Sequence, residues 1–307
     1  MNTRKTVAVL AVALFVALAF SACPSSNGDT PGDGTPPVVA PPGMVRIPAG
    51  TFIMGSPTSE TDSQDNERPQ HTVKLSAFWM GKYEVTQARY EAVMGSLPNN
   101  IISNSYGVGD NYPVYYVSWH NAIVFCNKLS IEEGLNPAYS INNSTDPDTW
   151  GSVPIETNTT WNAVVIVAGS NGYRLPTEAQ WEYACRAKTT TAFNTGATMS
   201  DSTGWYTDNS NGSTHEVGKK PANAWGLYDM HGNVWEWCWD KYNGYSGYPT
   251  DATVQTDPTG EASGDYRLIR GGAWNIYNAS LSLRSAARYS NFPIDRRSDI
   301  GFRLVRP

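Results

Sequence analysis

Apolar and polar residues alternate in several short segments of this chain. Residues 44–54 have the sequence MVRIPAGTFIM, in which Pro-Ala-Gly interrupts the alternation, and this predicts a β-hairpin. Residues 71–85 predict two further strands, and residues 113–117 and 162–168 predict shorter ones. Residues 300–305, IGFRLV, alternate again. They predict a strand that closes the domain.

Helix-capping signals occur between these strands. Thr86 precedes the periodic segment QARYEAVMG, whose last glycine is a stop signal, and Ser118 precedes a helix that we expect to reach Leu129. Thr177 and Gln180 have the spacing of a capping box. Because the predicted elements are short, the loops long and no repeat is present, the pattern predicts a single irregular, loop-rich α+β domain.

Structural and loop-like positions interleave from about residue 267 to 307. Gly271, Gly272 and Trp274, and further on Leu283 and Arg284, are residue types that serve close packing. The positions between them follow neither a helical nor a strand period, so we interpret them as loop residues of a ligand-binding surface. These candidate positions are Asn275, Ile276, Tyr277, Asn278, Ser280, Ser282, Tyr289, Ser290, Asn291, Phe292, Ile294, Arg297, Ser298 and Asp299.

The composition of this stretch is biased. Residues 275–299 contain no Lys, Glu, Gln, Met or Trp, and every residue type present can be encoded by a codon that ends in a pyrimidine. Free replacement of the adenines in Asn codons would produce this bias. An ordinary polar loop that is low in Lys and Glu by chance is the alternative. In the first interpretation Tyr277, Tyr289 and Phe292 are apolar anchors among adaptable Asn and Ser side chains, as in antibody loops.

The N-terminal segment predicts export. Residues 1–22 combine a basic start with an apolar run too short to span a bilayer, and they end on Ser-Ala before Cys23. This arrangement resembles the lipobox of bacterial lipoproteins and predicts lipid attachment at Cys23. An ordinary secretory signal is the alternative. Residues 23–43 are rich in Pro, Gly and Ser and predict a disordered tether, so the globular domain extends over residues 44–307.

Charge and cysteine content restrict the partners. The net charge of −6 and the pI near 5.2 exclude a typical nucleic-acid-binding protein, which needs a basic face. Cys126, Cys185 and Cys238 are an odd number without CxxC spacing, which predicts neither a disulfide framework nor a zinc site. We expect an exported, membrane-anchored bacterial lipoprotein at the outer membrane or cell surface. It would be a monomer, touch the membrane only through its lipid, and bind a protein or another cell-surface ligand.

Several longer motifs carry a family resemblance. In order, these are MVRIPAGTFIMGS, FWMGKYEVTQARYEAVMG, GYRLPTEAQWEYACRA, GLYDMHGNVWEWCWD, RLIRGGAW and GFRLVRP. Together they cover essentially residues 44–307 and resemble the formylglycine-generating, sulfatase-modifying enzyme family. The resemblance implies a C-type-lectin-like fold of that enlarged type.

The residues that carry the enzymes' chemistry are not present at the matching positions. The resemblance places a copper-binding cysteine pair after the segment that is Gly271–Trp274 here, but residues 275–280 are NIYNAS. We therefore expect neither copper nor catalysis, because the chemistry needs a thiolate as nucleophile and ligand. The resemblance also implies a disulfide partner for Cys185 near Ser285, and serine cannot form that bond.

A second branch on the same scaffold fits the C-terminal region better. The segment resembles the variable proteins of diversity-generating retroelements, in which adenine mutagenesis diversifies residues near the C-terminus. The leading hypothesis is thus a tethered ligand-binding lipoprotein, adhesin-like or receptor-like, with a diversified site and no catalysis. A divergent formylglycine-generating oxidase and a purely structural envelope protein are the alternatives.

The resemblance also implies a structural calcium site. Family enzymes bind calcium through residues that align with Asp229, Gly232, Val234 and Glu236, two of them through backbone carbonyls. Carboxylate and carbonyl oxygens suit such a hard cation. In the alternative interpretation, Asp229 and Glu236 cap turns or pair with an arginine.

Overall fold

Buried aromatic side chains form the centre of the domain in the computed structural model, which describes residues 40–98, 106–243 and 253–307. Trp119, Trp181 and Trp237 are almost completely buried. The indoles of Trp119 and Trp237 each donate to a backbone carbonyl at 2.9 Å, and that of Trp181 donates to the Glu236 carboxylate at 2.7 Å. A buried N–H group without an acceptor would cost roughly 1–3 kcal/mol, so these bonds fix how the surrounding segments pack.

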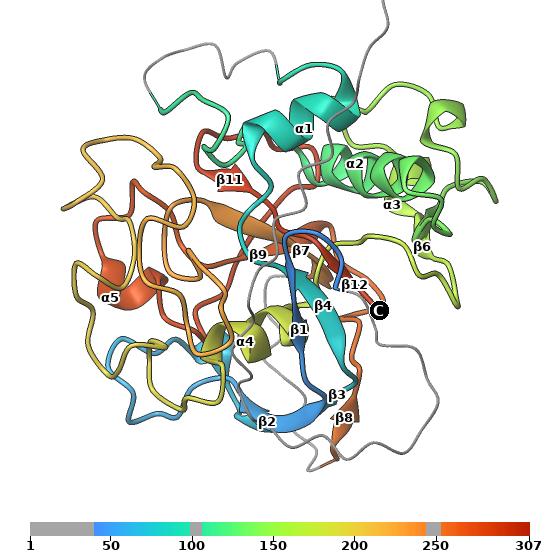
Figure 1. Ribbon diagram of the computed structural model, residues 1–307. Coiled ribbons are helices and arrows are strands. Elements are labelled where there is room, and N and C mark those ends of the chain that lie inside the picture. The colour runs from blue at the N-terminus through green and yellow to red at the C-terminus, as the bar shows by residue number, and fades with distance from the viewer. Residues whose placement is uncertain (1–39, 99–105, 244–252) are drawn as a thin grey trace, which may run out of the picture. The chain divides into compact units, whose positions relative to one another are not determined.

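The strands of the described residues form small sheets (Figure 1). The four-stranded sheet has the order β10-β9-β7-β11, and only its β7–β11 pair is parallel. Two three-stranded sheets have the orders β1-β4-β12 and β2-β3-β8, and β5 pairs with β6. The strands are β1 Met44–Ile47, β2 Gly50–Met54, β3 His71–Leu75, β4 Phe78–Gly81, β5 Tyr139–Ser140, β6 Val165–Ile166, β7 Trp235–Tyr242, β8 Gln255–Thr256, β9 Tyr266–Arg270, β10 Tyr289–Asn291, β11 Ile300–Gly301 and β12 Val305–Arg306.

The helices begin where the capping signals predict. Thr86 caps α1, Ser118 caps α2 and Thr177 caps α4, and the hydroxyl of each accepts a backbone N–H of the first helical turn. Gln180 completes the predicted capping box, and α2 runs one turn beyond Leu129. The helices are α1 Gln87–Met94, α2 Trp119–Glu132, α3 Thr159–Asn162, α4 Glu178–Arg186 and α5 Ala279–Ser282, with 3-10 turns η1 Asp65–Glu67 and η2 Pro147–Thr149.

Strand pairing differs from the predictions. The two strands of residues 44–54 do not form a hairpin, because β1 pairs with β4 and β2 pairs with β3. Residues 300–305 likewise divide between two sheets, with β11 beside β7 and β12 beside β4. In both segments the chain leaves one sheet for another, so a continuous alternation does not mean a single strand.

Three local predictions are also wrong. Residues 113–117 form an isolated bridge from Pro113 to Thr86 and no strand. The strand expected over residues 162–168 shrinks to β6, because Asn162 ends α3. The region interpreted as loop contains the short helix α5, which Asn278 caps, and the strand β10, which pairs with β9.

The described residues contain no helix that is both long and apolar enough to cross a bilayer. The described residues from Ala40 to Pro307 belong to one compact unit. The predicted export signal, Cys23 and most of the tether lie outside the described residues.

Candidate functional site

Three exposed aromatic side chains mark the surface of residues 275–299. Tyr277 is 87% exposed, Tyr289 is 41% exposed and Phe292 is 42% exposed. The ring centroid of Tyr289 lies 4.8 Å from that of Trp235, and that of Phe292 lies 4.5 Å from that of Tyr266. Tyr289 and Phe292 are therefore supported by a second ring while part of each side chain stays open to solvent. This is the form of a preformed apolar anchor.

Most other candidate positions also reach the surface. The buried exceptions are Ser282 and Asp299, so a solvent-facing position is wrong for these two. The Ser282 hydroxyl lies 3.2 Å from the Tyr289 hydroxyl. Asp299 accepts hydrogen bonds from Arg297 at 3.0 Å and from Asn275 at 3.1 Å, so its carboxylate is already paired within the segment. The exposed positions besides the aromatics are Asn278, Ser280 and Arg297, and the half-buried ones are Asn275, Ile276, Ser290, Asn291, Ile294 and Ser298.

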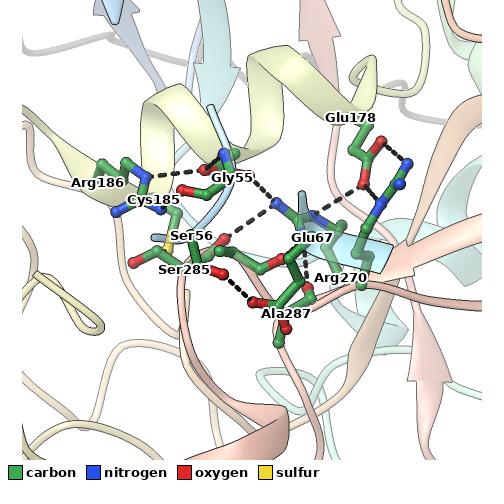
Figure 2. A network of polar contacts seen from close by, with 12 residues as sticks. Gly55, Ser56, Glu67, Glu178, Cys185, Arg186, Arg270, Ser285 and Ala287 are labelled. Atoms are coloured by element: carbon green, nitrogen blue, oxygen red, sulfur yellow. Dashed lines mark hydrogen bonds and ion pairs between the residues drawn. The ribbon is translucent and has the colours of Figure 1, made fainter. Parts of the chain in front are cut away.

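A buried arginine holds the base of this surface. Arg270, at the end of β9, pairs with Glu182 of α4 at 2.5 Å. Its guanidinium also donates to the backbone carbonyls of Ser285 and Ala287, which Figure 2 labels, and to that of Ala286. Removing one partner of a buried ion pair costs about 3–5 kcal/mol, so this contact strongly fixes the path of the segment.

Two more arginines tie the segment to distant parts of the chain. Arg284 pairs with both carboxylate oxygens of Glu67, at 2.5 and 2.7 Å, and with Glu60 at 2.8 Å. Arg288 makes a two-point contact with Glu178 at 2.7 and 2.6 Å. Both arginines are buried, as the sequence analysis expects of packing residues such as Arg284.

A cavity of about 420 Å³ opens beside Tyr289. The candidate segment contributes Tyr289 and Ser290 to its wall, and the scaffold contributes Asn66 and Tyr242. The side-chain oxygen of Asn66 is buried without a hydrogen-bond partner. Volumes of this size are typical of small-molecule pockets, so Tyr289 borders a concave region that can accept part of a ligand.

The cysteines of the described residues are buried and free. Burial raises the pKa of Cys185 to about 12, and it raises the pKa values of Cys126 and Cys238 above their ordinary range. A buried, protonated thiol is a poor nucleophile. The Sγ atom of Cys185 lies 3.6 Å from the Oγ atom of Ser285, so these residues are neighbours, as the family resemblance implies.

The acidic residues considered for calcium differ in their surroundings. Both oxygens of Glu236 accept hydrogen bonds from Arg303 at 2.6 Å, so for Glu236 the alternative of an arginine pair holds. One oxygen of Asp229 accepts the Gly218 N–H at 2.6 Å, while the other is buried without a partner. Burial raises the pKa of Asp229 to about 6. The described residues contain no group of three or more His, Cys, Asp or Glu side chains arranged for a metal.

Sequence reasoning missed Glu84, which is 2% exposed and follows β4. Neither of its carboxylate oxygens has a hydrogen-bond partner. Burial, together with the nearby charge of Asp229, raises its pKa well above the usual range. The carboxylate oxygens of Glu84 and Asp229 that lack partners are therefore better candidate ligands for a hard cation than those of Glu236, which both pair with Arg303. The only signal in the sequence is an acidic residue between Tyr83 and Val85.

Comparisons with known proteins agree with the sequence motifs. Residues 33–307 match the family described as the sulfatase-modifying factor enzyme 1-like domain. The chain belongs to this family. The protein named chaperone protein LppX of Paenibacillus barcinonensis is 33% identical, with 99% of each chain covered. The formylglycine-generating enzyme of Thermomonospora curvata is 29% identical, over 86% of this chain and 93% of that protein.

Among solved structures, Treponema denticola variable protein 1 superposes with a TM-score of 0.73 and 36% identity, covering 86% of this chain and 95% of its own. The structure of PvdO from Pseudomonas aeruginosa has a TM-score of 0.62 and 28% identity, over 86% of this chain and 93% of its own. The predicted α+β, C-type-lectin-like family fold is therefore confirmed, as is the similarity to variable proteins.

Proposed function

We propose that the protein is an exported lipoprotein that presents a diversified ligand-binding surface and has no catalytic activity. The observation that carries this proposal is the contrast within one segment. Tyr277, Tyr289 and Phe292 are open to solvent, whereas Arg284 and Arg288 between them are buried in ion pairs. Such a segment can change its outward side chains while its path stays fixed. The codon-type bias of residues 275–299 and the similarity to Treponema denticola variable protein 1 support the same function.

Diversification is tested by sequencing the gene deeply in a growing population, together with its flanking DNA. We expect substitutions at the exposed candidate codons, such as those of Tyr277 and Asn278, and none at those of Leu283 and Arg284. A near-copy of the last codons, rich in Asn codons and next to a reverse transcriptase gene, should accompany them. Substitutions spread evenly over exposed residues of the whole domain would contradict the proposal.

Ligand binding is tested with displayed libraries. One library varies Tyr277, Tyr289 and Phe292, and the matched control library varies Ile53, Ile131 and Val165, which are 48%, 48% and 56% exposed outside the candidate segment. After selection against one purified protein, the first library should yield specific binders that retain the melting temperature of the parent. Equal enrichment from both libraries would show that the segment has no special binding role.

The absence of catalysis rests on the buried thiols and on the sequence NIYNAS at residues 275–280. Purified protein should leave the cysteine of a sulfatase-type peptide unchanged, with and without copper. A variant that carries the cysteine arrangement of the enzymes at residues 275–280 is the comparison. Conversion of the peptide to formylglycine by the unmodified protein, detected by mass, would refute this part.

Membrane anchoring rests on the sequence around Cys23. The protein should incorporate radioactive palmitate and partition into detergent, and Cys23→Ser should do neither. If both forms enter the aqueous phase equally, export without an anchor is the better explanation. We further propose that the protein is a monomer, that its ligand is a protein or another cell-surface molecule, and that it contacts the membrane through the lipid alone.

We also propose a structural calcium ion. The carboxylates of Asp229 and Glu84 would bind it, together with the backbone carbonyls of Gly232 and Val234.

A second candidate function comes from one relative. The protein named chaperone protein LppX matches this chain over 99% of both lengths, and exposed aromatic side chains are also suited to binding unfolded chains. A chaperone would suppress the aggregation of several unrelated denatured proteins. A diversified receptor would bind one folded ligand tightly and leave aggregation unchanged, so a light-scattering assay separates the two functions.

A further inference from the structure

A second cavity, of about 450 Å³, lies apart from the aromatic anchors. The end of α1 and the turn after it form one side through Met94, Leu97 and Pro98, and Ile155 lies on another. These side chains give the cavity an apolar wall. Ile155 is 79% exposed, so its side chain is open to an apolar group of a ligand.

The cavity also contains a cation without an acidic partner. Arg296 lines it and is half-buried, and its guanidinium donates to the backbone carbonyls of Ile294 at 3.0 Å and Pro154 at 3.2 Å. Within the described part of the chain it forms no ion pair with Asp or Glu. Its neighbour Arg297, by contrast, pairs with Asp299. Two carbonyls leave most of the five guanidinium N–H groups available, so a carboxylate is the complementary group.

Neutral donors lie around the same cavity. Tyr90 lines it, and its phenol is protonated at neutral pH and can donate a hydrogen bond; burial raises its pKa further above the ordinary value. Asn121, in the first turn of α2, uses its side-chain oxygen to accept from Ser118, which leaves the amide N–H groups for another acceptor. The start of a helix also favours negative charge.

The backbone beside the cavity is strained. Tyr116 lines it and has a φ of 57°, a left-handed conformation that is rare for a bulky residue. The Tyr116 N–H donates to the carbonyl of Arg297 at 2.8 Å, and this bond holds the strained turn next to Arg296. Such strain is concentrated at binding sites, where it positions side chains for a ligand.

From this arrangement we infer that the cavity binds the free C-terminus of a peptide whose last residue is apolar. Arg296 and Tyr90 would hold the terminal carboxylate, and the wall formed by Met94, Leu97 and Ile155 would take the last side chain. Asn121 and the hydroxyl of Ser96 supply polar groups for the peptide amides. An alkyl carboxylate would leave those polar groups unpaired, so the lining favours a peptide over a fatty acid. This site does not depend on diversification of the segment.

The test is calorimetric titration of the full chain, in a non-ionic detergent, with N-acetyl-leucyl-phenylalanine and with its C-terminal amide. The free acid should bind about tenfold more tightly than the amide, because a charge-assisted pair replaces a neutral contact. Arg296→Gln should remove this difference. The matched control Arg297→Gln should keep it, and Tyr289→Ser, in the proposed ligand surface, should keep it as well.

A second pair of variants covers the case in which Arg296→Gln does not fold. Ile155→Asp changes a side chain that is 79% exposed, removes part of the apolar wall and places a negative charge at the cavity, so it should weaken binding of the acid more than binding of the amide. Ile131→Asp, at a side chain that is 48% exposed and outside the cavity lining, is the control. Equal affinity of the parent for acid and amide would overturn the inference, as would an unchanged affinity in Ile155→Asp. Binding of octanoate without binding of the peptide would also overturn it, since the cavity would then take lipids.

Discussion

Replacing Ser285 by cysteine should create a disulfide bond with Cys185. The Sγ atom of Cys185 already lies 3.6 Å from the Ser285 hydroxyl oxygen, and both residues are completely buried. A new sulfur at position 285 would therefore need only a small shift to reach bonding distance. Cys185 belongs to α4, so the bond would fasten that helix to the base of the candidate surface.

The expected gain follows from the length of chain that the bond closes. Cys185 and Ser285 are 100 positions apart, and chain-entropy estimates for such a loop give about 4.7 kcal/mol. Strain usually reduces this value, so we expect a gain of about 3 kcal/mol in the free energy of unfolding. For a domain of this size that corresponds to roughly 6–12 °C in melting temperature.

The assay is a urea and thermal melt of Ser285→Cys with and without reductant, with Ser285→Ala as the control. Mass spectrometry should show the loss of two hydrogens in the oxidised form. Because burial raises the pKa of Cys185 to about 12, oxidation should be fast during refolding and slow once the protein has folded. If the bond forms but the oxidised protein melts no higher than the reduced one, Cys185 and Ser285 are not close neighbours in the folded protein, and the inferred packing of α4 against the segment is wrong.

Three further predictions concern calcium, tolerance to substitution and pH. Calcium should raise the melting temperature, by the equivalent of about 2.7 kcal/mol at a concentration one hundred times its Kd. This increase should be smaller in the double variant Glu84→Gln, Asp229→Asn. If calcium does not change the melting temperature of the parent, the proposed calcium site is wrong. In a urea melt, Tyr277→Ser should change the free energy of unfolding by no more than about 0.5 kcal/mol. Phe302→Ser replaces a fully buried side chain and should lower it by about 3 kcal/mol or more. Equal losses in the two variants would show that Tyr277 is part of the core. Burial raises the pKa of Asp240 to about 7, so the stability linked to its protonation is complete below its ordinary pKa and is lost as pH rises through about 7. The melting temperature of the parent relative to Asp240→Asn should therefore fall between pH 5 and pH 8, and a constant difference would contradict the shift.

Helix starts were predictable because their signals are local. The hydroxyls of Thr86, Ser118 and Thr177 satisfy N–H groups only three residues away, so the sequence around each cap contains the whole interaction. Strand pairing is different, since β1 finds its partner in β4 more than thirty positions later. An alternating pattern indicates that a segment is extended, but it does not contain the identity of its partner.

The candidate surface shows the same limit. Residue types were sufficient to single out Tyr277, Tyr289 and Phe292, which proved exposed. Types alone could not show that Asp299 turns inward, because its partners Arg297 and Asn275 are brought together only by the folded loop. For the same reason Glu84, far from Asp229 in the sequence, did not emerge as its neighbour.

The way in which the scaffold holds the segment explains why its side chains can be free to vary. Arg270 donates to three consecutive backbone carbonyls of the segment, and a carbonyl is present whatever side chain the residue carries. The candidate positions Ile276 and Asp299 also accept through their carbonyls, from the N–H groups of Thr207 at 3.2 Å and Trp235 at 2.8 Å. Contacts of this kind fix the main chain without specifying its sequence. A surface built in this way can exchange outward side chains at little cost in stability, provided that the buried arginines beneath it keep their carboxylate partners.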